Sequence, residues 1–231
     1  MAVGWWMDIY GSKEAMFLST IKNILFPVFC LNCDKEGEWL CVDCGLKVKS
    51  NYQYYPDVDS LDGLTVFFNY NEKSIIGKLI KLLKYNYIRE LEYIIYSVIP
   101  ARPSLAEGIY DYFKDFSIIP IPLHPRRLRE RGFNQSEMIA KIFVNKFNFK
   151  KVENNILQRT KYTAQQAKLN KADRQQNLQD VFAIKKSVYV PENILLVDDV
   201  YTTGSTMYAC ANVLRKAGAE KVFGMVLARG V

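Results

Sequence analysis

The segment 194–206, ILLVDDVYTTGST, constrains the fold more than any other part of the chain. Its four apolar residues predict a buried strand that ends at Val197, and a helical pattern begins near Ser205, directly after a short turn. A strand, a turn and a helix in this order are typical of a parallel α/β sheet. Such sheets bind ligands at the carboxyl ends of their strands, which is where the two acids Asp198 and Asp199 fall.

The rest of the chain alternates between apolar runs and amphipathic stretches. Strands separated by helices predict a parallel sheet flanked by helices. We predict strands at 64–68, 118–122, 194–197 and 222–227, and helices at 16–26, 73–84, 89–99, 136–147 and 205–217. Three parts follow: an N-terminal helix with a cysteine-rich stretch (1–45), a helical adjunct or hood (46–116) and an α/β core (117–231). Within the second part, the polar residues 46–63 suit a linker or an edge.

Composition narrows the class of protein. Hydrophobic residues make up 49% of the 231 residues, enough for one substantial core. No apolar run reaches the roughly 20 residues of a membrane-spanning helix. The N-terminal stretch contains Asp8 and Glu14 and has no basic residue before Lys13, unlike a signal peptide. We therefore expect a cytoplasmic protein without membrane insertion.

Two C-x2-C pairs lie within CLNCDKEGEWLCVDC. The four residues are Cys30, Cys33, Cys41 and Cys44. Four thiolates at this spacing predict a compact structural zinc site with no open coordination position. A disulfide pair or four unconnected thiols are the alternatives, and a cytosolic setting favours the metal. Cys210 stands apart on the apolar face of the last predicted helix and is expected in the core.

The turn after Asp199 has the features of a phosphate-binding loop. Gly204 permits close approach of backbone N–H groups, the next helix presents the positive end of its dipole, and hydroxyl groups add donors. The residues of this loop are Thr202, Thr203, Gly204, Ser205 and Thr206. Two acids just upstream would repel a phosphate but suit sugar hydroxyls, so the pattern indicates a sugar 5′-phosphate as the ligand. An ordinary N-cap turn after an acidic strand end is the alternative.

The complete 13-residue stretch resembles the phosphoribosyl pyrophosphate (PRPP) signature of type I phosphoribosyltransferases. The resemblance implies that Asp198 and Asp199 contact the ribose 2′ and 3′ hydroxyls and that residues 202–206 hold the 5′-phosphate. It also implies that Mg²⁺ accompanies PRPP and that pyrophosphate leaves as a nucleophile attacks the anomeric carbon.

A basic loop is expected between the strand at 118–122 and the helix at 136–147. The stretch IIPIPLHPRRLRERGFNQS contains arginines that can each bridge two pyrophosphate oxygens. Those assigned to this role are Arg126, Arg127 and Arg131. A solvated basic turn or a nucleic-acid patch is the alternative, and the single histidine, His124, is not expected to be catalytic. Residues 159–182 suit either a loop that closes over the reacting centre or a plain surface hairpin.

Taken together, the motifs resemble the ComF family of phosphoribosyltransferase-like competence proteins. The resemblance covers about residues 21–231 and includes, in order, LFPVFCLNC, LIKLLKY, PIPLHPRRLRERGFNQS, RTKYTAQQAKLNKADRQQNL and ILLVDDVYTTGST. It implies a cytosolic protein that handles incoming single-stranded DNA in natural transformation, beside a helicase-like partner. In LIKLLKY, Lys84 is a candidate ligand-facing residue, although a solvated lysine is the default. Residues 1–15 fall outside the resemblance and are interpreted as an extension or a misassigned start.

Two functions from different classes follow. The first is a phosphoribosyltransferase that uses PRPP and an unknown acceptor during DNA uptake. The second is a non-catalytic, PRPP-responsive protein that binds single-stranded DNA. Residues 120–174 contain thirteen Lys and Arg against four Asp and Glu, a net charge of +9, whereas the whole chain has +7, which leaves −2 for the rest. Positive charge concentrated in this way suits a nucleic-acid backbone, although arginines that serve pyrophosphate alone and lysines on solvated helix faces are the simpler alternative.

Overall fold

The computed structural model describes residues 27–85, 89–100, 111–162 and 180–230. The chain divides into two compact units, Met1–Lys47 and Val48–Val231. None of the helices in the described ranges combines the length and the apolar character that crossing a bilayer requires.

The described part of the first unit is a cysteine-bearing turn followed by one turn of helix. The Cys30 N–H donates to the Lys35 carbonyl at 2.9 Å, and the Asp34 N–H donates to the Cys30 carbonyl at 3.0 Å. Helix α2 (Val42–Gly45) begins directly after Cys41, the first cysteine of the second pair. The helix predicted at 16–26 lies outside the described residues.

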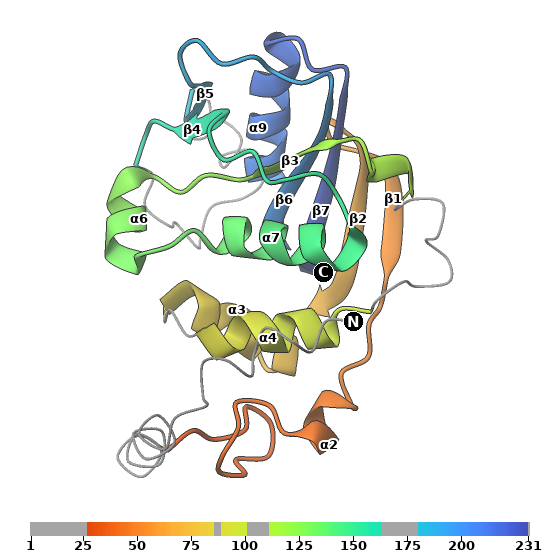
Figure 1. Cartoon of the computed structure of the whole chain (residues 1–231), viewed down its shortest axis with the longest axis vertical. Helices are drawn as coiled ribbons and strands as arrows, with labels where there is room; N and C mark the ends of the chain where they lie inside the picture. The colour runs from red at the N-terminus through yellow and green to blue at the C-terminus, as the bar shows by residue number, and fades with distance from the viewer. Residues whose placement is uncertain (1–26, 86–88, 101–110, 163–179, 231) are drawn as a thin grey trace. The chain divides into compact units, whose positions relative to one another are not determined.

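A five-stranded sheet forms the centre of the second unit, in the order β1-β2-β7-β6-β3. Its strands are β1 (Gln53–Val58), β2 (Leu61–Tyr70), β3 (Ser117–Pro120), β6 (Asn193–Tyr201) and β7 (Lys221–Gly230). Strand β1 runs antiparallel to β2, and every other neighbouring pair is parallel (Figure 1). The predicted α/β class, with a mostly parallel sheet, is confirmed.

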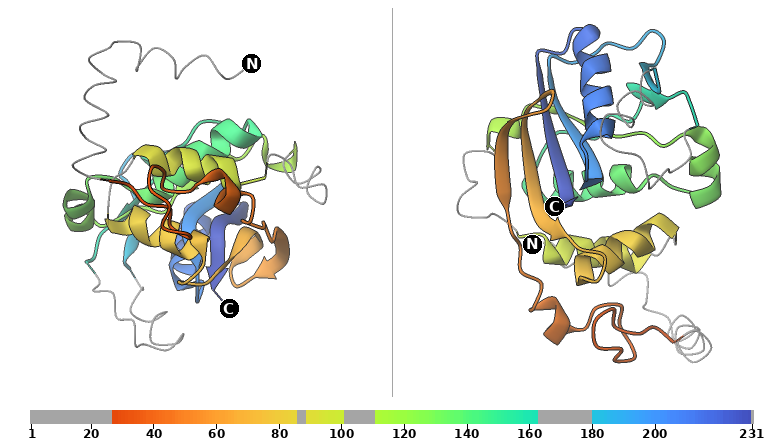
Figure 2. Two further views of the ribbon diagram at one scale, coloured as in Figure 1. Left: turned by 90° about the horizontal axis from the view of Figure 1, so that it is seen from below. Right: turned by 180° about the vertical axis from the view of Figure 1, so that it is seen from behind.

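Helices cover both faces of this sheet and the carboxyl ends of its parallel strands (Figures 1 and 2). They are α3 (Ile75–Tyr85), α4 (Arg89–Val98), α6 (Pro125–Arg131), α7 (Gln135–Phe147) and α9 (Ser205–Lys216). Helix α7 lies on one face, where the ring centroids of Phe143 and Phe67 are 5.1 Å apart. Helix α9 lies on the other face and buries Cys210 in one cluster with Leu64 and Val66. Helices α3 and α4 lie beyond the carboxyl ends of the strands.

The surroundings of strand β6 explain why its first residues are all apolar instead of alternating between apolar and polar. The side chains of residues 194–197 are all completely buried, because helices cover both faces of the sheet at this central strand. The strand also continues past the predicted end at Val197 to Tyr201, since β7 supplies backbone partners up to Arg229. The two acids therefore belong to the strand rather than to the turn after it.

A second, two-stranded sheet pairs β4 (Leu157–Arg159) with β5 (Phe182–Ile184) in antiparallel fashion. Leu157 and Phe182 are buried in the core cluster on the α9 side, which fixes this pair to the main unit. The pair brings together the two ends of segment 159–182, as the base of a hairpin would. Residues 163–179 lie outside the described residues, and closure of a loop over the site stays a prediction.

The first two strands of the sheet come from segment 46–116, which the sequence analysis assigned to a helical adjunct or hood. Strand β2 hydrogen-bonds to β7 along most of its length, so β1 and β2 belong to the same sheet as the C-terminal strands. Within it, β1 is the edge strand of the sheet, which is one of the two interpretations of the polar residues 46–63. A role for α3 and α4 as a hood stays a prediction.

Candidate functional site

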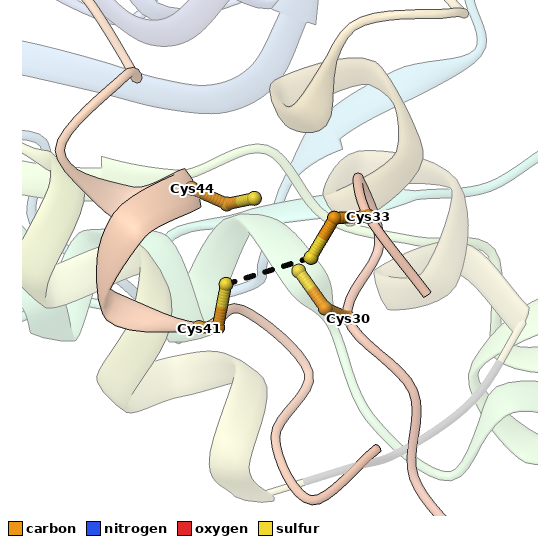
Figure 3. Close-up of side chains that lie close together, drawn as sticks. All are labelled: Cys30, Cys33, Cys41 and Cys44. Carbon is orange, nitrogen blue, oxygen red and sulfur yellow. Dashed lines mark hydrogen bonds between the residues drawn. The ribbon is translucent and has the colours of Figure 1, made fainter. Parts of the chain in front are cut away.

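The four cysteines of the first unit form one cluster, in which all four sulfur atoms lie within 4.8 Å of one another. Figure 3 shows the four sulfurs turned toward a common centre. The Sγ atoms of Cys33 and Cys41 are 3.7 Å apart, close to the roughly 3.8 Å edge of a tetrahedron with Zn–S bonds of about 2.3 Å. None of the five cysteines is in a disulfide. The donor set fits a structural metal ion such as zinc, as predicted.

Hydrogen-bond donors favour thiolate sulfur at Cys44 and Cys30. At Cys33 and Cys41 the backbone donors are outweighed, because the neighbouring thiols raise the pKa of Cys33 and, with burial, that of Cys41. The Asn32 side-chain amide donates to Cys44 Sγ at 3.3 Å. Burial raises the pKa of the Cys30 thiol, but nearby backbone N–H groups outweigh burial and lower that pKa to about 6. Hydrogen-bond donors to a ligating sulfur are the usual second layer around a zinc ion.

The acid pair lies in the second unit, near the carboxyl end of β6. Asp199 is only 4% exposed, and its Oδ2 lies 3.0 Å from Nζ of Lys84, at the end of α3. Asp198 Oδ1 accepts a hydrogen bond of 2.7 Å from the Ser136 hydroxyl, in the first turn of α7. Each carboxylate therefore has a different helix as its partner. Lys84 is not a freely solvated lysine but one half of an ion pair with the signature acid.

Two groups at this site, the Asp198 carboxyl and the Lys84 ammonium, have shifted pKa values. Burial, and after it the neighbouring Asp199, raises the pKa of Asp198 to about 7. Burial lowers the pKa of Lys84, but the Asp199 carboxylate more than offsets this, so the pKa of the ammonium is raised overall. At neutral pH the Lys84 ammonium is thus charged, while Asp198 is close to its midpoint and can gain or lose a proton.

The turn after β6 borders a small hollow. The residues around it are Asp198, Val200, Tyr201, Thr202, Thr203, Gly204, Ser205, Thr206 and Met207. The first N–H groups of α9 have no carbonyl partner within the helix, and Gly204 offers no side-chain cap for them. Thr203 Oγ1 and Ser205 Oγ are 2.9 Å apart, at the mouth of the same turn. The turn therefore places the first N–H groups of α9 and several hydroxyl groups around one hollow.

Gly204 is required at its position for two reasons. Its φ is +74°, a left-handed conformation that glycine adopts without strain. A Cβ atom there would also collide with the Tyr201 hydroxyl and the Asp59 carboxylate, which hydrogen-bond to each other. The turn between β1 and β2, which contains Asp59, thus packs directly under the loop.

The arginines lie in a helix, not in the loop that the sequence analysis expected. Helix α6 begins with His124 as its N-cap, whose Nδ1 accepts from the Arg126 N–H at 3.2 Å, and Pro125 occupies the first helical position. It ends at Gly132 in a left-handed conformation. These are ordinary start and stop signals, and the basic composition of the stretch obscured them.

The three predicted arginines have different surroundings. Arg131 Nη1 donates to Gln135 at 2.9 Å, and its guanidinium interacts electrostatically with Asp199. Burial, and after it Arg127, lowers the pKa of Arg131. Arg126 is exposed and pairs with Glu130 one turn along the helix. Of the three, Arg131 is therefore the one that the structure connects to the acid pair.

The chain is similar to known proteins over nearly its whole length. No family model matches it. Competence protein F of Haemophilus influenzae is 31% identical over 226 residues, which make up 96% of this chain and 93% of that protein. The chain belongs to the ComF family.

Further ComF relatives match shorter parts. Competence protein ComFC of Streptococcus pneumoniae is 36% identical over 124 residues, 53% of this chain and 52% of that protein. The DNA utilization protein YhgH of Escherichia coli K12 is 34% identical over 105 residues, 46% of this chain and 45% of that protein.

The sequence analysis of this ComF chain missed two residues of the site. Ser136 is 1% exposed and reaches Asp198 because Asn134 caps α7 and ties its start to the Ile121 carbonyl after β3. Arg159, at the end of β4, interacts electrostatically with Asp198 and Arg127. The run N-Q-S-E, an N-cap residue with Glu three positions later, signals the start of α7 and could have indicated the first of them. Arg159 is the first residue of the segment 159–182 that was considered as a closing loop, but no pattern in the sequence assigned this residue to the acid pair.

Proposed function

We propose that this protein binds PRPP and uses its phosphoribosyl group in the handling of incoming DNA, with an acceptor still to be identified. One observation supports the proposal above all. Two adjacent carboxylates, of which Asp199 is buried and Asp198 partly buried, lie near the carboxyl end of a central parallel strand, just before an uncapped helix N-terminus with four hydroxyl side chains in its turn.

The two halves of this arrangement suit the two ends of a ribose 5-phosphate. The N–H groups and hydroxyls of residues 202–206 would bind the 5′-phosphate, as helix N-termini commonly do. Asp198 and Asp199 would accept hydrogen bonds from the ribose 2′ and 3′ hydroxyls. A phosphate placed on the acids instead would be repelled, so the order of the two groups along the chain sets the orientation of the sugar.

Cationic side chains would serve the pyrophosphate. Arg131 is the arginine connected to the acid pair, and Arg126 and Arg127 lie one turn earlier on α6. Guanidinium groups stabilise charge that develops on a leaving pyrophosphate without forming a covalent bond. Mg²⁺ bound with PRPP would offset part of the same charge, and the two carboxylates of β6 are the residues at this site that could contact it.

Binding of the ribose would require Lys84 to change its ion-pair partner. Its ammonium already pairs with Asp199, and ribose hydroxyls would compete for the same oxygen. We expect Lys84 to turn toward the phosphate oxygens of the ligand while Asp199 takes the hydroxyl. The exchange keeps both buried charges paired, which matters because an unpaired buried charge is costly.

The biological setting is proposed from the relatives. The matching proteins are named for competence and for DNA utilization, and we extend a role in DNA uptake to this chain. We expect it to act in the cytoplasm, beside a helicase-like partner.

The test is calorimetric titration of the zinc-loaded protein with PRPP and Mg²⁺, with ribose 5-phosphate as the second ligand. We expect saturable binding of both, tighter for PRPP. Asp198→Asn combined with Asp199→Asn should abolish binding of both ligands, whereas Asp115→Asn, which changes a carboxylate that is 85% exposed, should not. Absence of PRPP binding by the folded wild-type protein would refute the proposal.

A second candidate function is binding of single-stranded DNA without catalysis. The concentration of positive charge in residues 120–174 favours it. DNA affinity should then fall steeply with added salt and survive the double Asp→Asn change. A flat salt response would count against this function, and equal loss of PRPP and DNA binding would show that the two sites are not separate.

A further inference from the structure

An exposed aromatic ring lies against the arginine helix. Tyr162, three residues after the end of β4, is 42% exposed. The Cζ atoms of Arg126 and Arg127 lie 4.8 and 5.8 Å from the centroid of its ring. His124, the N-cap of α6, packs edge-on against the same ring with 5.3 Å between centroids. One tyrosine thus contacts the N-cap residue of α6 and two of its arginines from a different part of the chain.

The arginines on this side of the site are under mutual repulsion. Arg127 lies close enough to Arg131 and to Arg159 to lower the pKa of both, although burial is the larger cause in each. Arg126 has Glu130 as a partner at 3.1 Å. Within the described residues, Arg127 makes no ion pair, and the ring of Tyr162 is its favourable contact.

A ring and a carboxylate would hold an arginine in different ways. A carboxylate cancels the positive charge and occupies the N–H donors. An aromatic face attracts the cation but leaves its charge and its in-plane N–H groups available. Held by a ring, a guanidinium keeps its capacity to bind an anion while losing part of its side-chain freedom, which lowers the entropic cost of binding.

We infer that Tyr162 is a positioning residue for the pyrophosphate of PRPP, which it serves by holding the guanidinium groups of Arg126 and Arg127. Among the described residues no carboxylate pairs with Arg127, so its donors stay available for the ligand, whereas Arg126 gives its Nε–H to Glu130. The inference rests on the proposed function for the identity of the ligand, and on the ring contacts for the role of the residue. Tyr162 itself need not touch the ligand. Its effect is specific to ligands that bear a pyrophosphate, because the 5′-phosphate loop and the acid pair belong to β6 and α9.

The test compares three variants of the full, zinc-loaded chain. Tyr162→Ala removes the ring, Tyr162→Phe keeps the ring without its hydroxyl, and Tyr189→Ala removes a tyrosine that is 77% exposed and contacts none of these arginines. PRPP with Mg²⁺ and ribose 5-phosphate are titrated into each. We expect Tyr162→Ala to weaken PRPP binding about fivefold and to leave ribose 5-phosphate within twofold. Tyr162→Phe and Tyr189→Ala should bind both ligands as the wild type does.

A second readout needs no ligand. The ring current of Tyr162 should shift the side-chain Nε–Hε NMR signals of Arg126 and Arg127, and this shift should disappear in Tyr162→Ala and persist in Tyr162→Phe. Unchanged arginine signals in Tyr162→Ala, unchanged PRPP affinity, or an equal loss for both ligands would each overturn the inference. If the wild type binds no PRPP, the proposed function fails, and the NMR comparison still decides whether Tyr162 holds the arginines.

Discussion

The cysteine cluster and the acid pair are both compact groups of ligand atoms, yet the chain assembles them differently. All four cysteines fall within 15 consecutive residues, and local backbone hydrogen bonds shape the turn that presents them. In the acid pair, only Asp198 and Asp199 themselves are neighbours in the sequence. Its partners Lys84 and Ser136 come from α3 and α7, and Ser136 lies 62 residues before Asp198. A local site needs its own turn and its metal, whereas a distributed site needs the whole sheet and its helices.

The largest expected effect is the loss of the cysteine cluster in a variant that keeps the acid pair intact. Cys44→Ala should abolish stoichiometric zinc binding, because structural zinc contributes about 10 kcal/mol or more of binding free energy that an incomplete ligand set cannot supply. Hydrogen exchange should then rise throughout residues 27–47 and stay slow in the strands of the sheet. Cys210→Ala, a change at the buried thiol of α9, should keep the zinc. Loss of protection across β6 and β7 in Cys44→Ala would contradict the independence of the two sites.

The next effect concerns the ion pair of the second site. Lys84→Met leaves Asp199 as a buried carboxylate without its ammonium partner and should destabilise the fold by about 3 kcal/mol in urea unfolding. Lys81→Met, on the exposed side of the same helix, should cost little. Adding Asp199→Asn to Lys84→Met should restore much of the lost stability, since no buried charge then remains unpaired. An additive loss in the double variant would show that the pair does not act as a unit.

A smaller effect is expected at the hydroxyl that supports Asp198. Ser136→Ala removes a hydrogen bond to a carboxylate and should cost about 2 kcal/mol. It should also raise the pKa of Asp198 further, because that hydrogen bond favours the charged form. Ser97→Ala, which removes a hydroxyl bonded to a backbone carbonyl of α4, is the matched control. If both variants unfold at the same urea concentration as the wild type, the contact to Asp198 contributes nothing.

The smallest effect, counted per pH unit, is the dependence of stability on pH. Asp198 keeps its proton up to about pH 7 in the folded state, whereas it loses it near pH 4 in the unfolded chain. The stability from this proton is therefore complete below about pH 4 and is lost as the pH rises toward 7, by at most about 1.4 kcal/mol per pH unit. The free energy of unfolding, measured from pH 4 to 8, should decline less in Asp198→Asn than in the wild type. PRPP affinity should change in the opposite direction and rise as the carboxyl group ionises.

Two segments show where sequence reasoning failed for physical reasons. Helix α6 was expected to be a loop because four arginines in seven residues suggest a solvated turn, although its cap residues were visible. The expectation that Lys84 is solvated was wrong, because the sequence LIKLLKY does not show which part of the sheet the end of α3 packs against. Only the packing of α3 beyond the strand ends brings that ammonium to a carboxylate more than a hundred residues later.

The sequence by itself determined the features that depend on neighbours along the chain. These are the cysteine cluster, the central strand with its two acids, the glycine-containing turn and the helix after it, and with them the α/β class. Tertiary structure decided which groups meet across the strand ends: Lys84 with Asp199, Ser136 with Asp198, and Tyr162 with the arginines of α6. Local patterns follow from backbone geometry and periodic burial, which a sequence displays directly. Contacts between distant segments depend on how helices pack on a sheet, and no local pattern records that.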